Sequence, residues 1–216
     1  MSRKVHIDLG AYLGESIVRF FQQRRNVPIF DIYAFEPHPN NYIKLVENIG
    51  SWKGVNCINA AAGTKDGTIK LYISDSKECQ RASEFENKIA GEVGSVSSVE
   101  VKTIDFCKWL KETTDSTDYI SIAMNIEGAE YALMDAIIDN GLLDRIDCIE
   151  IKLHEQKVSD PKIKDGLVKT RERFLNEVKK YNFWVQIATK YRTEGGNEYV
   201  SDIVLDMRAY EPSRKG

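Results

Sequence analysis

"HIDLGAYLGES", residues 6–16, is the stretch that decides how the rest of the chain is interpreted. An apolar run containing the acidic Asp8 leads into a turn bounded by Gly10 and Gly14. A strand that passes through a glycine turn into a helix begins a βα unit, and open α/β sheets bind ligands outside the carboxyl ends of their strands. Glycines let the backbone approach a ligand, although the same spacing also lets a helix pack tightly on a strand.

Segments of strand length and segments of helical period alternate along the chain. We expect strands at 4–9, 30–36, 55–61, 119–126 and 146–153, added β-segments at 68–74 and 99–104, and helices at 14–25, 40–49, from Asp105, at 128–140 and at about 161–181. This alternation predicts a parallel sheet with helices on both faces.

The chain ends in two more strand-like runs, "FWVQIAT" and "YVSDIVLDM", joined by a short loop with Gly195 and Gly196. A short loop can join only antiparallel neighbours. We therefore predict one domain, residues 1–216, with a Rossmann-like α/β fold of the class I methyltransferase type. Its sheet would be mainly parallel and seven-stranded, with a C-terminal antiparallel hairpin and helices on both faces.

Two segments are predicted to contact the substrate: residues 75–98, which lack a clear period, and the loop 189–199 between the last two strands. The second contains Tyr191 and Arg192, which could bind a sugar or its phosphate. A solvent-exposed hairpin tip is an equally good interpretation of this pair.

Composition limits the class of protein. The 216 residues carry a net charge of −3, which lacks the basic excess of a nucleic-acid binder. No apolar stretch has the length of a membrane span, and the first ten residues do not form a signal peptide. We expect a cytoplasmic protein whose partner is a small-molecule or glycan acceptor; the sequence does not indicate an oligomeric state.

A second ligand signal is "FEPHP", residues 35–39. Glu36 ends the second expected strand, where a carboxylate accepts hydrogen bonds from both hydroxyls of a ribose in nucleotide-binding folds. The dinucleotide fingerprint requires a middle glycine, and Tyr12 stands there. Asp8 would repel a pyrophosphate but suits the α-ammonium of a methionine, so S-adenosylmethionine is favoured over NAD.

Three motifs together resemble the FkbM family of methyltransferases: "IDLGAYLGES", "FEPHPNNYIKLVENI" and "NIEGAEYALMDAI". A looser likeness covers "NAAAGTKDGTIKLY" and "VKTIDFCKWL". The resemblance implies S-adenosylmethionine-dependent O-methylation, often of a hydroxyl on a sugar or natural product. It implies a cofactor site at Asp8, Gly10, Gly14, Glu36 and Pro37, with Ala60 and Ala61 beside adenine and Ala11 and Tyr12 within the glycine turn.

The chain departs from the family at one strand end. The usual pattern there is K-x-D-x-E-G-x-E, whereas this chain has "AMNIEGAE", with Ala123 for the lysine and Asn125 for the aspartate. This departure leaves open that the protein binds the cofactor without catalysis.

The catalytic candidates follow the fourth and fifth strands. We predict His154 as the general base, because its unperturbed pKa lies near neutrality, with Asn125 and Glu127 beside it. A surface histidine in the loop "LHEQK" is an equally good interpretation of His154. Asn125, Glu127 and Glu150 could also hold a Mg²⁺ or Mn²⁺ ion that polarises the acceptor hydroxyl, and we expect the base and the ion to act together. A small natural product or a nitrogen acceptor is the alternative to a sugar.

Overall fold

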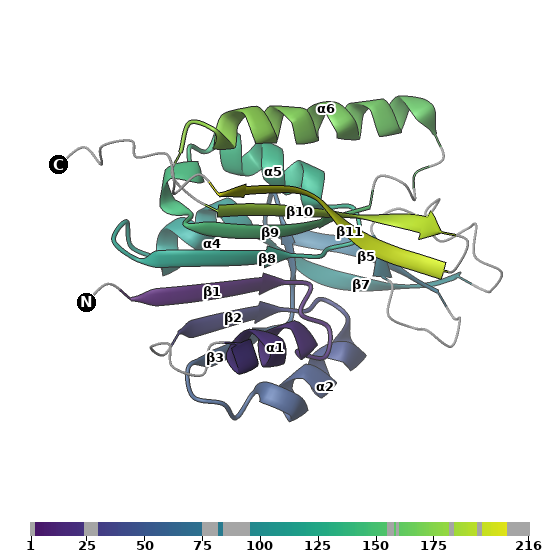
Figure 1. Ribbon diagram of the computed structural model, residues 1–216. Helices are drawn as coiled ribbons and strands as arrows, with labels where there is room; N and C mark the ends of the chain where they lie inside the picture. Colours follow the sequence, from purple (N-terminus) through teal and green to yellow (C-terminus); the bar gives the residue numbers. More distant parts are fainter. Residues whose placement is uncertain are drawn as a thin grey trace.

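The computed structural model describes residues 3–23, 30–74, 82–83, 96–154, 158, 160–181, 184–193 and 196–206. Its central sheet has seven strands in the order β11-β10-β9-β8-β1-β2-β3, and all neighbours except β10 and β11 run parallel (Figure 1). The strands are β1 (Lys4–Leu9), β2 (Asp31–Phe35), β3 (Val55–Ile58), β8 (Tyr119–Met124), β9 (Cys148–Leu153), β10 (Trp184–Thr193) and β11 (Gly196–Asp206). The predicted mainly parallel α/β sheet is confirmed.

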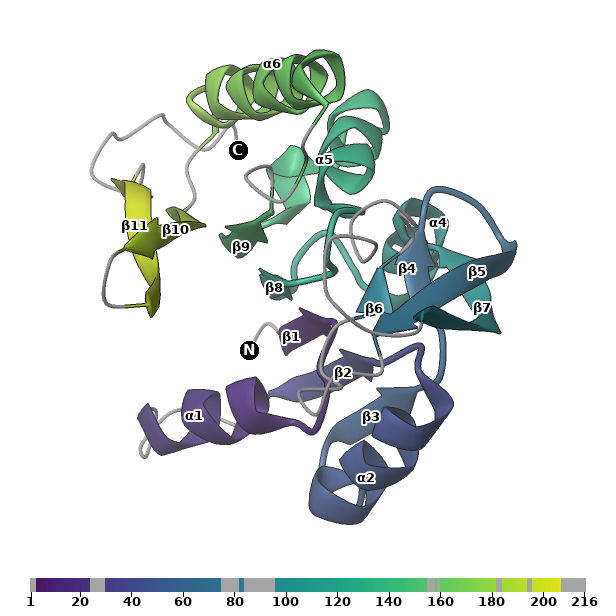
Figure 2. The same ribbon diagram turned by 90° about the vertical axis from the view of Figure 1, so that its right-hand side faces the viewer.

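Helices cover the sheet from two sides. They are α1 (Glu15–Gln23), α2 (Pro39–Ile49), α4 (Phe106–Thr113), α5 (Glu130–Asp139) and α6 (Pro161–Val178), with a short 3-10 turn at Leu143–Arg145. Figure 2 shows α4, α5 and α6 on one side of the sheet and α1 on the other. None of the helices in the described ranges is both long and apolar enough to cross a membrane.

The two faces of the sheet bury different sets of side chains. Ile7 and Leu9 of β1 belong to the larger core, which includes Phe106 of α4 and Phe174 of α6. On the opposite face, α1 and α2 pack on β2 in a smaller core formed by Ala11, Ile17, Phe30, Ile32, Ala34, Leu45 and Ile49. The alternation along β1 therefore turns Asp8 away from the larger core and toward the α1 side.

A second, four-stranded sheet was not predicted as a separate unit. Its order is β4-β7-β5-β6, from β4 (Ala61–Gly63), β5 (Gly67–Ser74), β6 (Ala82–Ser83) and β7 (Val96–Asp105). The single strand predicted at 55–61 is wrong, because the chain leaves the central sheet at Asn59. The Asn59 side-chain amide donates to the carbonyls of Glu36 and Pro37, at 2.9 and 3.2 Å, and so fixes the point of departure.

The C-terminal hairpin also differs from its prediction. Strands β10 and β11 pair from Trp184 with Asp206 up to Thr193 with Gly196, so most of the segment 189–199, predicted as a loop, is strand. Tyr191 and Arg192 lie within β10, and their side chains fall outside the described residues. Of the other predicted substrate segment, 75–98, only 82–83 and 96–98 are described.

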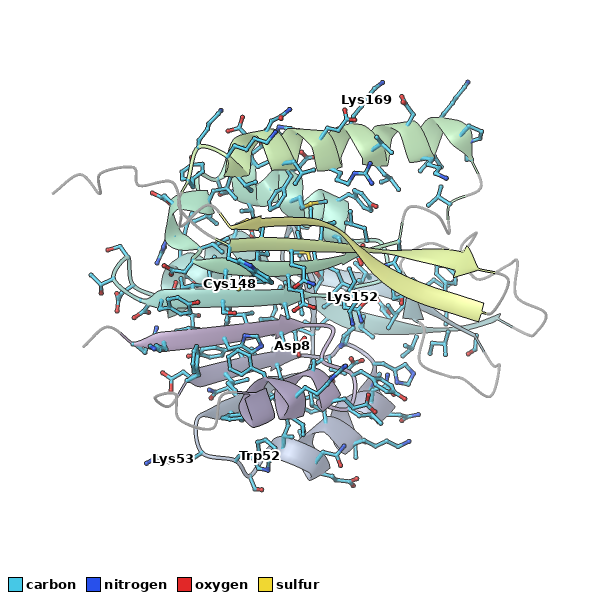
Figure 3. All side chains as sticks on the ribbon, in the orientation of Figure 1. Asp8, Trp52, Lys53, Cys148, Lys152 and Lys169 are labelled. Carbon is cyan, nitrogen blue, oxygen red and sulfur yellow. The ribbon has the colours of Figure 1, made fainter. Side chains whose placement is uncertain are left out.

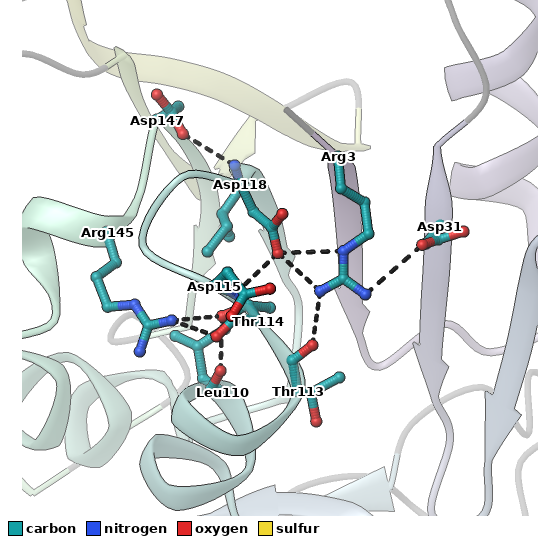
Figure 4. Close-up of polar contacts among 10 residues, drawn as sticks. Arg3, Asp31, Leu110, Thr113, Thr114, Asp115, Asp118, Arg145 and Asp147 are labelled. Atoms are coloured by element: carbon teal, nitrogen blue, oxygen red, sulfur yellow. Dashed lines mark hydrogen bonds and ion pairs between the residues drawn. The ribbon is translucent and has the colours of Figure 1, made fainter. Parts of the chain in front are cut away.

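An ionic cluster joins the amino ends of the strands, at the opposite end of the sheet from the glycine turn (Figure 4). The Asp118 carboxylate accepts hydrogen bonds from the Arg3 guanidinium, at 2.7 and 3.1 Å, and from the backbone N–H of Asp115, at 2.9 Å. Arg3 also lies 3.7 Å from Asp31 and donates to the carbonyl of Thr113. This cluster connects the starts of β1, β2 and β8.

The Asp118→Asn variant should lower the free energy of unfolding by about 1–3 kcal/mol, because charged hydrogen bonds are lost at a buried group. Burial raises the pKa of Asp118, but the hydrogen bonds from Arg3 and Asp115 outweigh it and lower the pKa overall. The difference in free energy of unfolding between wild type and Asp118→Asn should therefore be largest at neutral pH. It should vanish as the pH falls through the lowered pKa of Asp118 in the folded protein. Urea unfolding of both proteins tests this, with the exposed Asp144→Asn as control; equal stability of all three would contradict it.

Candidate active site at the carboxyl ends of the strands

A cavity of about 420 Å³ opens at the carboxyl ends of β1, β2 and β8. Its lining combines the glycine turn, the end of β2, the start of the second sheet and the loop after β8: Gly10, Ala11, Tyr12, Glu15, Ser16, Arg19, Phe35, Glu36, Pro37, Asn41, Ala60, Ala61, Ala62, Ile69, Leu71, Asn125, Ile126, Glu127, Ala129 and Lys152. This is the position at which open α/β sheets bind ligands.

The two glycines of the turn are required by the protein itself. Gly10 has φ +86°, and a Cβ there would stand 2.3 Å from the carbonyl oxygen of Asn125. Gly14 has φ +88°, and a Cβ there would meet the side chains of Leu45 and Ile49 on α2. Gly14 lines neither of the cavities described in this section. The glycines therefore let β1 close against β8 and α2, which is the packing interpretation of the spacing.

Glu36 ties the first two strand ends together. One carboxylate oxygen accepts the backbone N–H of Tyr12 and the other that of His38, both at 2.9 Å, and Asn41 approaches the second oxygen at 3.5 Å. Glu36 is 5 % exposed but lines the cavity. Burial raises its pKa to about 7, although the hydrogen bonds from His38 and Tyr12 act in the opposite direction.

Asp8 lies beneath the turn, on the α1 side of the sheet. It accepts a hydrogen bond from the Ser16 hydroxyl, and burial raises its pKa to about 6 against the lowering effects of Ser16 and Lys152. Asp8 lines a second cavity, of about 410 Å³, together with His6, Phe20, Ala123, Met124 and Glu150. The two cavities share Gly10, Ser16, Arg19, Asn125 and Lys152, so they meet beside the turn; Figure 3 labels Asp8 and Lys152.

Three titratable side chains meet behind the loop that follows β8. His154 is 1 % exposed, with Nδ1 2.9 Å from Glu130 Oε1 and Nε2 3.3 Å from Glu127 Oε1. Glu130 also accepts the backbone N–H groups of Ile126 and Gly128, at 3.1 and 2.7 Å. Among the three, Glu127 lines the first cavity.

This geometry corrects the prediction for His154. The ring follows β9 as expected, but it is enclosed and lines neither cavity. Direct proton transfer from an acceptor to His154 is therefore inconsistent with its place in the structure. Asn125 and Glu127 do line the first cavity as predicted.

The predicted metal site is not formed. Of the three predicted ligands, Glu127 lines the first cavity, Glu150 is exposed and lines the second, and Asn125 lines both. Glu127 is turned to His154. Within the described part of the chain, no cluster of three or more His, Cys, Asp and Glu side chains could hold a metal ion.

The structure places most of the predicted cofactor residues on one wall. Those on the first cavity are Gly10, Ala11, Tyr12, Glu36, Pro37, Ala60 and Ala61. Sequence reasoning missed Ile69 and Leu71 of β5, which face the same cavity. Their strand was visible in the alternation of residues 68–74, but nothing in that pattern says that the strand covers the end of β2.

The sequence model described as "Methyltransferase FkbM domain" matches residues 8–187. The chain belongs to the FkbM methyltransferase family. The matched range includes the glycine turn, Glu36, the loop with Glu127 and Glu130, and His154. Membership in this family supports methyl transfer as the activity.

Among solved structures, the chain is similar to a methyltransferase FkbM from Methylobacillus flagellatus KT. The two are 17 % identical, with a TM-score of 0.38, and the match covers 64 % of this chain and 30 % of that chain. The FkbM chain described here thus matches less than a third of that protein's length. Comparison with curated proteins gives no match.

The raised pKa of Asp8 predicts a pH dependence of stability. Between about pH 4 and pH 6 the folded protein keeps a proton that the unfolded chain releases, so stability should fall as pH rises through this window. Asp8→Asn should remove about 2–3 kcal/mol of this fall, since each pKa unit corresponds to about 1.4 kcal/mol. Urea unfolding of both proteins at about pH 4.5 and about pH 7.5 measures it; an equal fall in wild type and variant would refute it.

Proposed function

We propose that this FkbM-family protein is an S-adenosylmethionine-dependent O-methyltransferase that acts on a hydroxyl of a sugar or glycan. One observation carries the proposal: a buried carboxylate, Glu36, lines a cavity beside the glycine turn and shares it with an apolar wall. That combination fits the ribose and the adenine of a nucleoside.

The residues present fit the nucleoside part of the cofactor. Each Glu36 oxygen accepts one backbone N–H at 2.9 Å and keeps further acceptor capacity for a ribose hydroxyl. Ala60, Ala61, Ile69 and Leu71 offer an apolar surface for a flat base. Asn41 can add a polar contact at the rim.

The residues at the junction of the two cavities fit the amino-acid part. Asp8 offers a buried carboxylate for an ammonium, and Ser16 already donates to it. Lys152 and Arg19 line both cavities and can balance the carboxylate of a methionine. Tyr12, with φ +55°, occupies the place where a dinucleotide fingerprint has glycine, and this favours S-adenosylmethionine over NAD.

When bound, the cofactor supplies a methyl group on a sulfonium, which is an electrophile. The protein must then orient a hydroxyl toward that methyl and accept its proton. Glu127 is the base we propose, because its carboxylate lines the cavity at the end of β8. Asn125 is placed to orient the acceptor from the same strand end.

Binding measurements test the cofactor assignment. Glu36→Ala should weaken binding of S-adenosylhomocysteine by about 1–3 kcal/mol, because two ribose hydroxyls lose their partner. Glu47→Ala removes an exposed carboxylate from the neighbouring α2 and should leave the affinity unchanged. Titration calorimetry with S-adenosylhomocysteine and NAD provides the measurement. Unchanged affinity in Glu36→Ala, or tighter binding of NAD, would overturn the assignment.

Transfer of labelled methyl to a panel of mono- and oligosaccharides tests the reaction. We expect an ether product on at least one sugar hydroxyl, and Glu127→Gln should lower turnover by about 10²–10⁴-fold, the range of a general base. If labelled methyl is found only on nitrogen compounds or on small natural products, the acceptor is of that alternative class and not a sugar. Cofactor binding with no transfer at all would identify a relative without catalysis.

A further inference from the structure

The loop that carries Glu127 is held from behind by one side chain. Glu130 is fully buried at the start of α5 and accepts the backbone N–H groups of Ile126 and Gly128. These two bonds flank Glu127, whose φ of +53° lies in the left-handed region. A non-glycine residue held there costs on the order of 1–3 kcal/mol and persists where the surroundings impose it. The loop is therefore built to present the Glu127 side chain in one direction.

The position of His154 decides which ring nitrogen carries hydrogen. Nδ1 lies 2.9 Å from the Glu130 carboxylate, and a carboxylate oxygen accepts, so Nδ1–H donates to Glu130. In the neutral ring Nε2 is then an acceptor, and it faces Glu127 Oε1 at 3.3 Å. Two acceptors face each other until a proton lies between them. When Glu127 takes up a proton, its carboxyl group can therefore donate a hydrogen bond to Nε2 of the neutral His154 ring.

We propose that His154 is a positioning residue that acts through Glu127: it orients the Glu127 carboxylate toward the acceptor and holds the proton that Glu127 takes up. This inference rests on the proposed function and names how its base is prepared. His154 does not touch the acceptor, since its side chain is fully enclosed between the two glutamates.

Methyl transfer from the sulfonium to the acceptor hydroxyl balances in protons and electrons without another reactant. The acceptor oxygen forms a bond to the methyl carbon as the carbon–sulfur bond breaks, and the bonding pair stays on sulfur, which loses its charge. The acceptor O–H bond breaks and its proton passes to Glu127, where Nε2 of His154 accepts a hydrogen bond from it. Glu130 keeps the Nδ1 hydrogen in place, so the ring cannot turn away.

Substitutions at His154 separate its two contacts. In His154→Asn the amide can replace the Nδ1 contact to Glu130 but is too short to reach Glu127. In His154→Gln the longer side chain can reach Glu127 and hold its orientation. We expect His154→Asn to lower kcat by about 10- to 100-fold, by analogy with the loss of an outer-shell partner that orients a metal ligand. His154→Gln should recover part of the loss, and KM and S-adenosylhomocysteine affinity should stay within about threefold.

A double variant tests whether His154 acts through Glu127. In the Glu127→Gln background, His154→Asn should cause no further loss of kcat, because the group it serves is already gone. The same fold-loss in both backgrounds would overturn the proposal. Asp118→Asn, which removes a buried carboxylate at the opposite end of the sheet, is the matched control and should leave kcat unchanged.

NMR of the His154 ring tests whether Nε2 contacts Glu127, and it needs no acceptor substrate. The chain has three histidines, so the ring ¹⁵N resonances of His154 can be assigned by substitution. In ligand-free protein, Nδ1 should carry the hydrogen, and Glu127→Gln should move the Nε2 resonance while Asp118→Asn leaves it in place. A Nε2–H tautomer, or an Nε2 resonance unaffected by Glu127→Gln, would overturn the proposal. Failure of the wild type to methylate any sugar would count against the proposed function alone.

Discussion

The carboxylate of Glu36 is the contact on which the site depends. It accepts the N–H groups of Tyr12 and His38 and thereby fixes the turn after β1 against the end of β2. Burial raises the pKa of Glu36 to about 7, because the charged carboxylate is less well solvated there than in water. In the proposed function, the same carboxylate also accepts the paired hydroxyls of a ribose, because each of its oxygens has acceptor capacity beyond these backbone bonds.

The second organising constraint lies at the end of β8. Glu127 and Glu130 both contact the His154 ring. Of the predicted metal ligands Asn125, Glu127 and Glu150, the last is exposed and lines the second cavity without the first, and the described residues hold no cluster suited to an ion.

Much of the fold followed from the sequence because local pattern and sheet position agree. The apolar runs gave the parallel strands, and Asp105 begins α4 by accepting the N–H of Lys108, as its residue type predicts. Features that depend on distant contacts did not follow. The need for Gly10 arises from the carbonyl of Asn125, and the departure of β4 depends on Asn59. The burial of His154 involves Glu130, which lies 24 residues earlier at the start of α5. Neither periodicity nor residue type records such distances, which is why the enclosure of His154 behind Glu127 could not be predicted from the sequence.

A crystal structure of the protein with S-adenosylhomocysteine tests the central claim most directly. The account predicts that both ribose hydroxyls donate to Glu36, that adenine lies against Ala61 and Leu71, and that the sulfur points toward the end of β8 beside Glu127. The Tyr12 and His38 N–H groups should keep their bonds to Glu36. A ligand whose ribose avoids Glu36, or whose sulfur lies in the second cavity away from Glu127, would contradict it.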